Sequence, residues 1–481
     1  MAVGVALVVV SFILVKTANT RPSYDGYGWL VWGYQTLHLH LDLGGAPSWK
    51  PLPFLFTVPF SLFGSHAVRL WMVLSMAFSL SGVVFAGRIA YRLVAGEHGT
   101  RPVTWIVAVV AGLGVLGIDQ YEHYILTAQS DPMIVALCLA AVDLHLSRRY
   151  RIAFVCLVLA SLGRPEAWPF AGLYAVWVWR EVPSARVLLV AGLALIPALW
   201  FGVPTITNGR PFVSAQLAQF SVHRISGNIF TDTFDRYFVL TVLPIKLLAL
   251  AAVGIAAARR NRVVLMLAAG AGLWVLIELA FALLRWPALP RYMFESGAVQ
   301  CVLAAVGLGW IALELPRLAS RAGAFSMPRW VSVPVALLLV GALVPGALAR
   351  VRAGRHDLRH ERWRSTQIVR LKDVIRAVGG YRHIRYCGRP VTYVGFVSVL
   401  AFDMRLNVGF VGHRPKQDLR RHVPVILFTE GRNGWTVEPS HLRADKRLSC
   451  DGLEATVIFN RAHPGGIVVT DREARWLRRP T

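Results

Sequence analysis

The sequence predicts a mainly α-helical, polytopic transmembrane bundle of about eleven spans, followed by a small α/β domain outside the membrane. Of its 481 residues, 55% are hydrophobic and only 16% are charged. That is too little charge to cover a soluble protein of this length. Long apolar runs fill the first 350 residues, and arginine clusters separate many of them. After residue 350 the chain becomes more polar and changes to short alternating stretches, which indicates a second domain over 351–481.

The transmembrane domain over 1–350 is defined by its apolar runs. Several runs are shorter than the ~20 residues that a perpendicular helix needs to cross a bilayer. The first run lacks a basic start and a small-residue cleavage site, so it is predicted to be a retained span and not a signal peptide. The pair 152–163 and 165–179 is either two short helices or one long, kinked helix. The predicted spans are 2–17, 68–92, 103–118, 131–147, 152–163, 165–179, 187–203, 237–258, 263–284, 293–314 and 330–349.

Charge in the loops predicts the orientation. With the N-terminus in the cytoplasm, the cytoplasmic loops each contain arginine, whereas aspartate and glutamate collect in the opposite loops. This is the distribution that the positive-inside rule describes, so the net charge of +25 does not indicate nucleic-acid binding. An odd number of spans then places the C-terminal domain outside an inner or plasma membrane. The arginine-containing loops are 88–102, 148–151, 180–186, 259–262 and 315–329.

The C-terminal domain is predicted to contain a helix near 363–378 and several short strands bounded by Gly, Pro and Asn. The expected strands lie in HIRYCGRPVTYVGFVSVLAF, VPVILFTEG, ATVIFN and GIVVTD. The domain is rich in arginine, which either solubilises it or binds an anionic envelope polymer or phospholipid head groups. Cys387 and Cys450 both fall here, and a disulfide between them would require an oxidising compartment.

The first outer loop, predicted over residues 18–67, places two opposite charges beside apolar chain. Asp25 lies in RPSYDGYGWLV and Lys50 lies in PSWKPLPFLFT, both among aromatic residues. The aromatic residues suit an interfacial anchor, and this explanation is sufficient for His38, His40 and Asp42. A charge so near hydrocarbon is expensive and is usually paired or solvated in a cavity. Asp25 and Lys50 are therefore candidates for a site.

Other charged residues lie at the same predicted membrane face. Asp131 precedes a proline at the start of a span, so a helix-capping role is an open alternative for it. A face with three cations and several acids can hold a lipid-linked phosphate and activate a hydroxyl group. The further candidates are Glu122, Asp131, Arg164, Glu166, Arg291 and Tyr292.

These motifs resemble those of the GT-C superfamily, the membrane glycosyltransferases that use polyprenyl-phosphate sugars. The run from YDGYGWLVWGYQTLHLHLDLGG to WKPLPFLFTVPFSLFG resembles the first outer loop of that superfamily. SDPMIVALCLA, LGRPEAW and PRYMFESG are similar to later motifs of bacterial mannosyl-, arabinosyl- and aminoarabinose-transferring members. The chain departs from the pattern in reading Lys-Pro-Leu-Pro for Lys-Pro-Pro and in having Gly26 after Asp25 where some members have a second acid.

The resemblance implies an inverting transfer of a sugar from a polyprenyl-phosphate donor to a glycan, lipid or protein outside the cytoplasm. Asp25 would be the general base. Lys50 would bind the donor phosphate, with Arg291 and Arg164 next in order. Asp131 would either orient the acceptor or, with Asp25, bind a divalent cation such as Mg²⁺ or Mn²⁺. Glu166, Tyr292 and Glu122 are the remaining candidates.

Two other functions compete with this one. A transporter or flippase of lipid-linked sugars should carry charges deep in its spans, and Glu278 is the one conspicuous acid at that depth in the sequence. A non-catalytic scaffold whose basic domain binds envelope polymer would leave the charged residues of the first loop unexplained.

Overall fold

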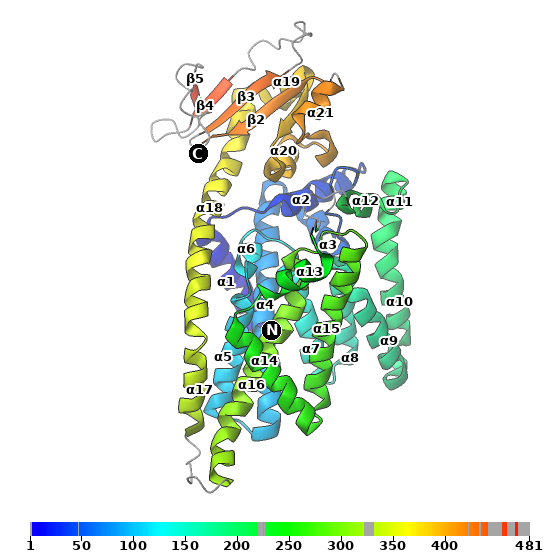
Figure 1. Ribbon diagram of the computed structural model, residues 1–481. Coiled ribbons are helices and arrows are strands. Elements are labelled where there is room, and N and C mark those ends of the chain that lie inside the picture. The colour runs from blue at the N-terminus through cyan, green and yellow to red at the C-terminus, as the bar shows by residue number, and fades with distance from the viewer. Residues whose placement is uncertain are drawn as a thin grey trace.

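The computed structural model describes residues 2–46, 48–219, 225, 227–321, 331–421, 423–431, 434–440, 455–458 and 467–469. Long helices run side by side through the lower two thirds of the molecule, and a small sheet with short helices lies at its upper end (Figure 1). The predicted mainly helical bundle with a C-terminal α/β part is therefore confirmed.

The bundle is built from the apolar runs of the sequence. Its helices are α1 (Ala2–Ala18), α4 (Ala67–His98), α5 (Pro102–Leu116), α7 (Asp131–Leu146), α8 (Tyr150–Gly163), α9 (Trp168–Glu181), α10 (Arg186–Pro197), α14 (Leu243–Arg259), α15 (Arg262–Leu283), α16 (Phe294–Arg321) and α17 (Ser332–Gly341). Shorter helices connect them, namely α2 (Tyr24–Leu37), α3 (Pro51–Ser61), α6 (Tyr121–Leu126), α11 (Val203–Asn208), α12 (Val213–Gln219) and α13 (Ile229–Phe238).

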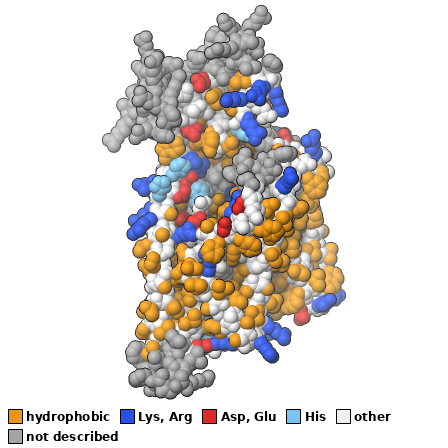
Figure 2. Space-filling view, in the orientation of Figure 1, with side chains coloured by type: hydrophobic (Ala, Val, Ile, Leu, Met, Phe, Trp, Pro, Cys, Tyr) orange, Lys and Arg blue, Asp and Glu red, His pale blue; other side chains and the backbone are white. Residues whose placement is uncertain are grey.

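Within the described ranges, four helices are long and apolar enough to cross a membrane, or six if each of two bent pairs is one span. One bent pair is α13 with α14, at 97°, and it divides the predicted span 237–258. Several other predicted spans fold as apolar helices shorter than 18 residues. On the face shown in Figure 2, apolar side chains form a broad band across the bundle, with charged side chains above and below it. This distribution is the one expected of a protein immersed in a bilayer.

The choice left open for 152–163 and 165–179 is resolved as two helices. Arg164 separates α8 from α9 in an extended conformation, with φ −150° and ψ 132°. The following Pro165 explains this, because a proline sterically disfavours the helical conformation of the residue before it.

The C-terminal part begins inside a helix. The helix α18 (Val344–Ala377) is continuous, so the predicted boundary at 350 and the predicted helix 363–378 both fall within it. It follows α17 at a bend of 42° and runs along the left edge of the bundle up to the sheet (Figure 1). Because α18 belongs to both parts, the C-terminal part is attached to the bundle by a helix and not by a flexible linker.

The sheet has five strands in the order β1-β2-β3-β4-β5. β1 pairs with β2 in parallel, with Val391 opposite Leu427, and the other pairs are antiparallel. The elements are α19 (Gly380–Cys387), β1 (Arg389–Thr392), α20 (Val397–Met404), α21 (Pro415–Arg420), β2 (Val425–Glu430), β3 (Gly434–Ser440), β4 (Ala455–Ile458) and β5 (Ile467–Val469).

The strand prediction was partly wrong. The stretch 383–402 was expected to be extended, but only Arg389–Thr392 forms a strand and the flanking residues lie in α19 and α20. Short apolar runs do not distinguish a strand from a buried helix, and tertiary packing decides here. The strands expected in VPVILFTEG, ATVIFN and GIVVTD are present as β2, β4 and β5, whereas β3 was not predicted.

The hydrophobic core of the C-terminal part is shared with the first outer loop. One buried cluster contains Trp29 and Trp32 of α2 together with Leu371 of α18 and Leu400 of α20. α2 lies across the top of the bundle, directly below α20 (Figure 1). Gly45 marks how closely the loop approaches, because a Cβ added there would lie 1.9 Å from the backbone nitrogen of Gly409. The C-terminal part therefore packs as a cover on the loop that carries Asp25.

Candidate active site at the upper end of the bundle

The first outer loop folds back on itself and brings its two charged segments together. α2 begins at Tyr24, so Asp25 lies in its first turn, where the helix dipole favours a carboxylate. The indole nitrogen of Trp29 donates to the carbonyl oxygen of Ser48 at 2.8 Å. The Ser48 hydroxyl then donates to Oδ1 of Asp25 at 2.5 Å. Lys50 follows two residues later, as the extended N-cap of α3.

Asp131 is the centre of the charged cluster. Its side chain is fully buried, and it accepts from Arg164 and, at 3.4 Å, from Lys50 Nζ. Lys50 also donates to the Ser130 hydroxyl at 2.9 Å. Arg291 lies on the other side, with Nε 3.9 Å from Oδ2 of Asp131 and Nη2 3.5 Å from Oδ2 of Asp25. A carboxylate surrounded by three cations is stabilised as a buried ion in this way.

This arrangement does not support the alternative in which Asp131 only caps a helix. Ser130 is the N-cap of α7 and makes no side-chain cap, while the Asp131 carboxylate is engaged by cations from other parts of the chain. The same cations make the place unsuitable for a divalent metal, because Lys50, Arg164 and Arg291 would repel it. The residues around Asp25 and Asp131 therefore do not fit a Mg²⁺ or Mn²⁺ ion.

The cluster has an open part and a closed part. The side chains of Asp25, Lys50 and Arg291 retain 13%, 15% and 17% exposure. Asp131 and Arg164 have 0% and 3%. The first three can contact a ligand, whereas the other two lie beneath them. Arg164 is held there by Asp131 and by Glu166, whose carboxylate it contacts at 3.0 Å.

Two aromatic rings surround the cations. The Arg164 guanidinium lies 3.9 Å from the centre of the Tyr292 ring, and Arg291 lies 5.5 Å from the rings of Tyr292 and Tyr124. Such contacts stabilise a cation without neutralising it. The guanidinium charge of Arg291 therefore remains available to an anion.

Burial also affects Lys50. Desolvation lowers the pKa of its ammonium group from the ordinary value, Asp131 raises it, and the positive charges of Arg164 and Arg291 lower it further. A phosphate placed beside Lys50 would relieve this destabilisation, because the opposite charge favours the protonated amine.

Of the residues predicted from sequence, the structure brings seven together: Asp25, Lys50, Asp131, Arg164, Glu166, Arg291 and Tyr292. Glu122 does not join them. It lies on α6 beside Gly354 of α18, where a Cβ added to the glycine would be 2.7 Å from Glu122 Oε1. Sequence reasoning missed Ser48, Tyr124 and Ser130, each of which lies within two residues of a predicted charge or in the same short loop.

The sequence contains one feature that four charged residues of the site share, which is a neighbouring proline. Lys50, Asp131 and Arg164 each precede a proline, and Arg291 follows one. Proline is favoured in the first turn of a helix, and it forces the residue before it away from helical geometry. These charged residues therefore stand at helix starts, where side chains project from the end of the helix.

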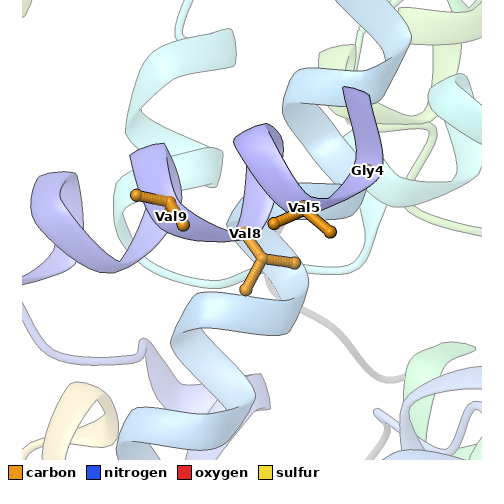
Figure 3. Close-up of a pocket in the computed structure, with 4 residues that line it drawn as sticks. All are labelled: Gly4, Val5, Val8 and Val9. Carbon is orange, nitrogen blue, oxygen red and sulfur yellow. The ribbon is translucent and has the colours of Figure 1, made fainter. Parts of the chain in front are cut away.

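A hollow on the protein surface, lined by other residues than this cluster, is not a candidate active site. It has a volume of about 490 Å³ and is lined by Gly4, Val5, Val8 and Val9 of α1 (Figure 3). All four residues are apolar, so the hollow offers no group for chemistry. It suits contact with lipid chains.

The fold has counterparts among solved structures. The structure of ArnT from Cupriavidus metallidurans bound to undecaprenyl phosphate superposes with a TM-score of 0.50 at 16% sequence identity, over 95% of this chain and 96% of that one. This chain has the fold of ArnT. The apo structure of the same ArnT matches with the same TM-score and identity over 89% and 92% of the two chains. The helical-bundle fold that the sequence resemblance implies is thus confirmed. No protein-family profile matches the sequence, and no curated protein matches it.

Proposed function

We propose that this protein is an integral membrane glycosyltransferase that moves a sugar, with inversion, from a polyprenyl-phosphate donor to an acceptor outside the cytoplasm. The observation that carries the proposal is the partly exposed group of Asp25, Lys50 and Arg291 above the buried Asp131–Arg164 pair. The ArnT fold supports the donor class, because that ArnT is bound to undecaprenyl phosphate.

Asp25 is the proposed general base. Transfer with inversion requires attack of an acceptor oxygen on the anomeric carbon from the side opposite the leaving phosphate. Asp25 Oδ2 is the oxygen free of the Ser48 hydrogen bond, and it takes the acceptor proton as the new bond forms. Ser48, by donating to Oδ1, fixes the orientation of the carboxylate.

Lys50 and Arg291 are the proposed phosphate ligands. The leaving group departs as a lipid phosphate that carries negative charge, and two cations beside it stabilise that charge in the transition state. The sequence also predicts Arg164 as a phosphate ligand, but its burial and its contacts with Asp131 and Glu166 favour a positioning role. Asp131, in turn, holds the three cations in one place and does not itself act on substrate.

The proposed location is an inner or plasma membrane, with the N-terminus in the cytoplasm and the C-terminal domain outside. Cys387 is disulfide-bonded, which suits an oxidising compartment. Cys450, its expected partner, lies outside the described residues. The acceptor is an envelope glycan, lipid or protein, and the C-terminal part covers the loop on which the acceptor would meet Asp25.

The test is transfer of radiolabel from undecaprenyl-phosphate sugars by the purified protein in proteoliposomes, with a cell-envelope fraction as acceptor. We expect label to leave the lipid. Lys50→Ala should weaken donor binding by about 10- to 100-fold, the worth of a charge-assisted hydrogen bond. Asp42→Asn is the matched control, since Asp42 lies on the same loop but accepts from Asn208 Nδ2 at 2.5 Å, away from the cluster.

The same proteoliposomes test the transporter. Glu278 is fully buried in α15 and adjoins Glu166, so one deep carboxyl group does lie beneath the site. If labelled donor crosses between leaflets without being consumed, the protein is a flippase and the proposed transferase function is wrong.

A further inference from the structure

A second polar cluster lies away from the candidate active site, where α6 packs against the middle of α18. It contains His123 of α6 and Asp357 and Glu361 of α18. One ligand atom from each of these residues lies within 4.8 Å of the others, and no other group of three His, Cys, Asp or Glu residues meets this condition in the described part of the chain. The proposed transferase chemistry uses none of them.

The sequence explains why the side chains converge. Asp357 and Glu361 are four residues apart, so they project from one face of α18. Gly354 lies on that face, three residues earlier. Its missing side chain admits Glu122, whose Oε1 would lie 2.7 Å from a Cβ at that position. Glu122 and His123 of α6 thus both approach α18, the first at Gly354 and the second at Asp357.

The contacts within the cluster leave negative charge uncompensated. His123 Nδ1 lies 2.8 Å from Asp357 Oδ2. Glu361 accepts from Arg364 Nε at 2.7 Å, and its other oxygen lies 3.8 Å from His360 Nδ1. Among the described residues, the carboxylates of Asp357 and Glu361 therefore share one directly bonded guanidinium and two imidazoles. A simple His123–Asp357 ion pair accounts for neither Glu122 nor Glu361.

We propose that His123, Asp357 and Glu361 bind a divalent transition-metal ion that fastens α6 to α18. One imidazole nitrogen with carboxylate oxygens is a donor set that Zn²⁺ accepts. Tetrahedral ligands about 2.1 Å from zinc lie about 3.4 Å apart, so the ligand atoms, which lie within 4.8 Å of one another, need to close by about 1.4 Å at most. Arg364 remains on Glu361 and orients it, as an outer partner does in metal sites.

The ion has access to this place. His123 and Asp357 keep 27% and 35% of their side-chain exposure, while Glu361 is buried at 6%. The site also borders the active-site loops. The Ser23 backbone nitrogen, just before α2, donates to Thr127 at the end of α6 at 2.9 Å. A metal at α6 would thus fix the segment that leads to Ser130 and Asp131.

The experiment uses the full-length protein, purified without a polyhistidine tag and dialysed against ZnCl₂ and then metal-free buffer. Elemental analysis should find about one zinc per chain. EDTA should lower the Tm by about 2 °C or more, and added ZnCl₂ should restore it. His123→Ala and the milder Asp357→Asn should both lose the metal while remaining monodisperse. His356→Ala, an exposed histidine on the same helix, should keep it.

Two results would overturn the inference. One is a wild-type protein that holds no metal above background and melts at the same temperature with and without EDTA. The other is a His123→Ala protein that still holds about one zinc per chain, because the ion would then be bound elsewhere. Because these readouts need no substrate, they are independent of whether the protein transfers sugar.

Discussion

At the scale of single residues, the candidate site contains two kinds of charged residue, which are buried or partly exposed and have different roles. Asp131 and Arg164 are buried and bind each other, so they organise the cluster. Asp25, Lys50 and Arg291 keep some exposure and remain able to meet a ligand. A buried charge that loses its partner is strongly destabilised. Substitutions of Asp131 therefore damage folding as well as activity, whereas Lys50 is the informative position for chemistry.

Lys50 gives the proposed reaction a specific pH dependence. Its pKa is lowered because burial disfavours the ammonium form, an effect that Asp131 opposes and that Arg164 and Arg291 strengthen. The amine should therefore lose its proton at a lower pH than an ordinary lysine, and donor binding should weaken as pH rises through that value. In Lys50→Arg the alkaline limb of kcat/KM should move to higher pH, because a guanidinium stays protonated above pH 12.

The measurement is kcat/KM against pH for wild type, Lys50→Arg and the control Asp42→Asn. Wild type and the control should share one alkaline limb. An identical limb in Lys50→Arg would show that another group titrates there.

At the scale of elements, the contact between α18 and α20 contains a buried acid. Asp403 of α20 has only 3% side-chain exposure, and its one ion-pair partner among the described residues is Lys372 of α18 at 3.6 Å. Burial raises the pKa of Asp403 to about 7, and the nearby positive charges of Lys372 and Arg21 only partly offset this. The C-terminal cover is thus attached to α18 through a group that titrates near neutrality.

Asp403→Asn should therefore change how stability depends on pH. The unfolded carboxyl group has a pKa of about 3.9. Between that value and 7 the folded protein holds a proton that the unfolded chain has released, so wild-type stability falls as pH rises. The variant lacks this loss, which amounts to at most about 4 kcal/mol. Its Tm relative to wild type should be higher at pH 8 than at pH 5.

Thermal unfolding at both pH values checks this, with Asp373→Asn as control because Asp373 pairs with Arg376 on an exposed face. An equal Tm difference at pH 5 and pH 8 would contradict a raised pKa for Asp403.

At the scale of the whole molecule, the bundle and its C-terminal cover form one structure around the first outer loop. Trp29 and Trp32 lie in a core with Leu371 and Leu400, so the loop that carries Asp25 is packed between the two parts. A site between a bundle and a cover can exclude water. This arrangement suits a reaction between a membrane-bound donor and an acceptor from outside.

The sequence predicted most residues of the charged cluster because a charge beside apolar chain is expensive unless it is paired or solvated. Lys50, Arg164 and Arg291 each interrupt an apolar region beside a proline, and a proline favours a helix start at each of these positions. The apolar runs of the sequence also predicted where most helices of the bundle lie. Glu122 was misplaced because hydropathy identifies the face but not which neighbouring helix a side chain meets.

The C-terminal part was harder to predict. Hydropathy falls near residue 350, where the domain boundary was predicted, but α18 continues through this position, so the change in composition does not mark the end of a helix. The stretch around Arg389 has the apolar residues of a strand, yet most of it is helical because Val399 and Leu400 pack into the core with α2. Long-range contacts decide such cases, and they are not visible in a local pattern.

The most direct test of the transferase is the single-turnover rate of sugar transfer from labelled undecaprenyl-phosphate donor, compared between Asp25→Asn and Asp42→Asn. Loss of a general base costs about 10²- to 10⁴-fold in rate. We predict a fall of this size in Asp25→Asn, with donor still bound, and no change in Asp42→Asn. Transfer by Asp25→Asn at the wild-type rate would contradict the role of Asp25 and the mechanism built on it.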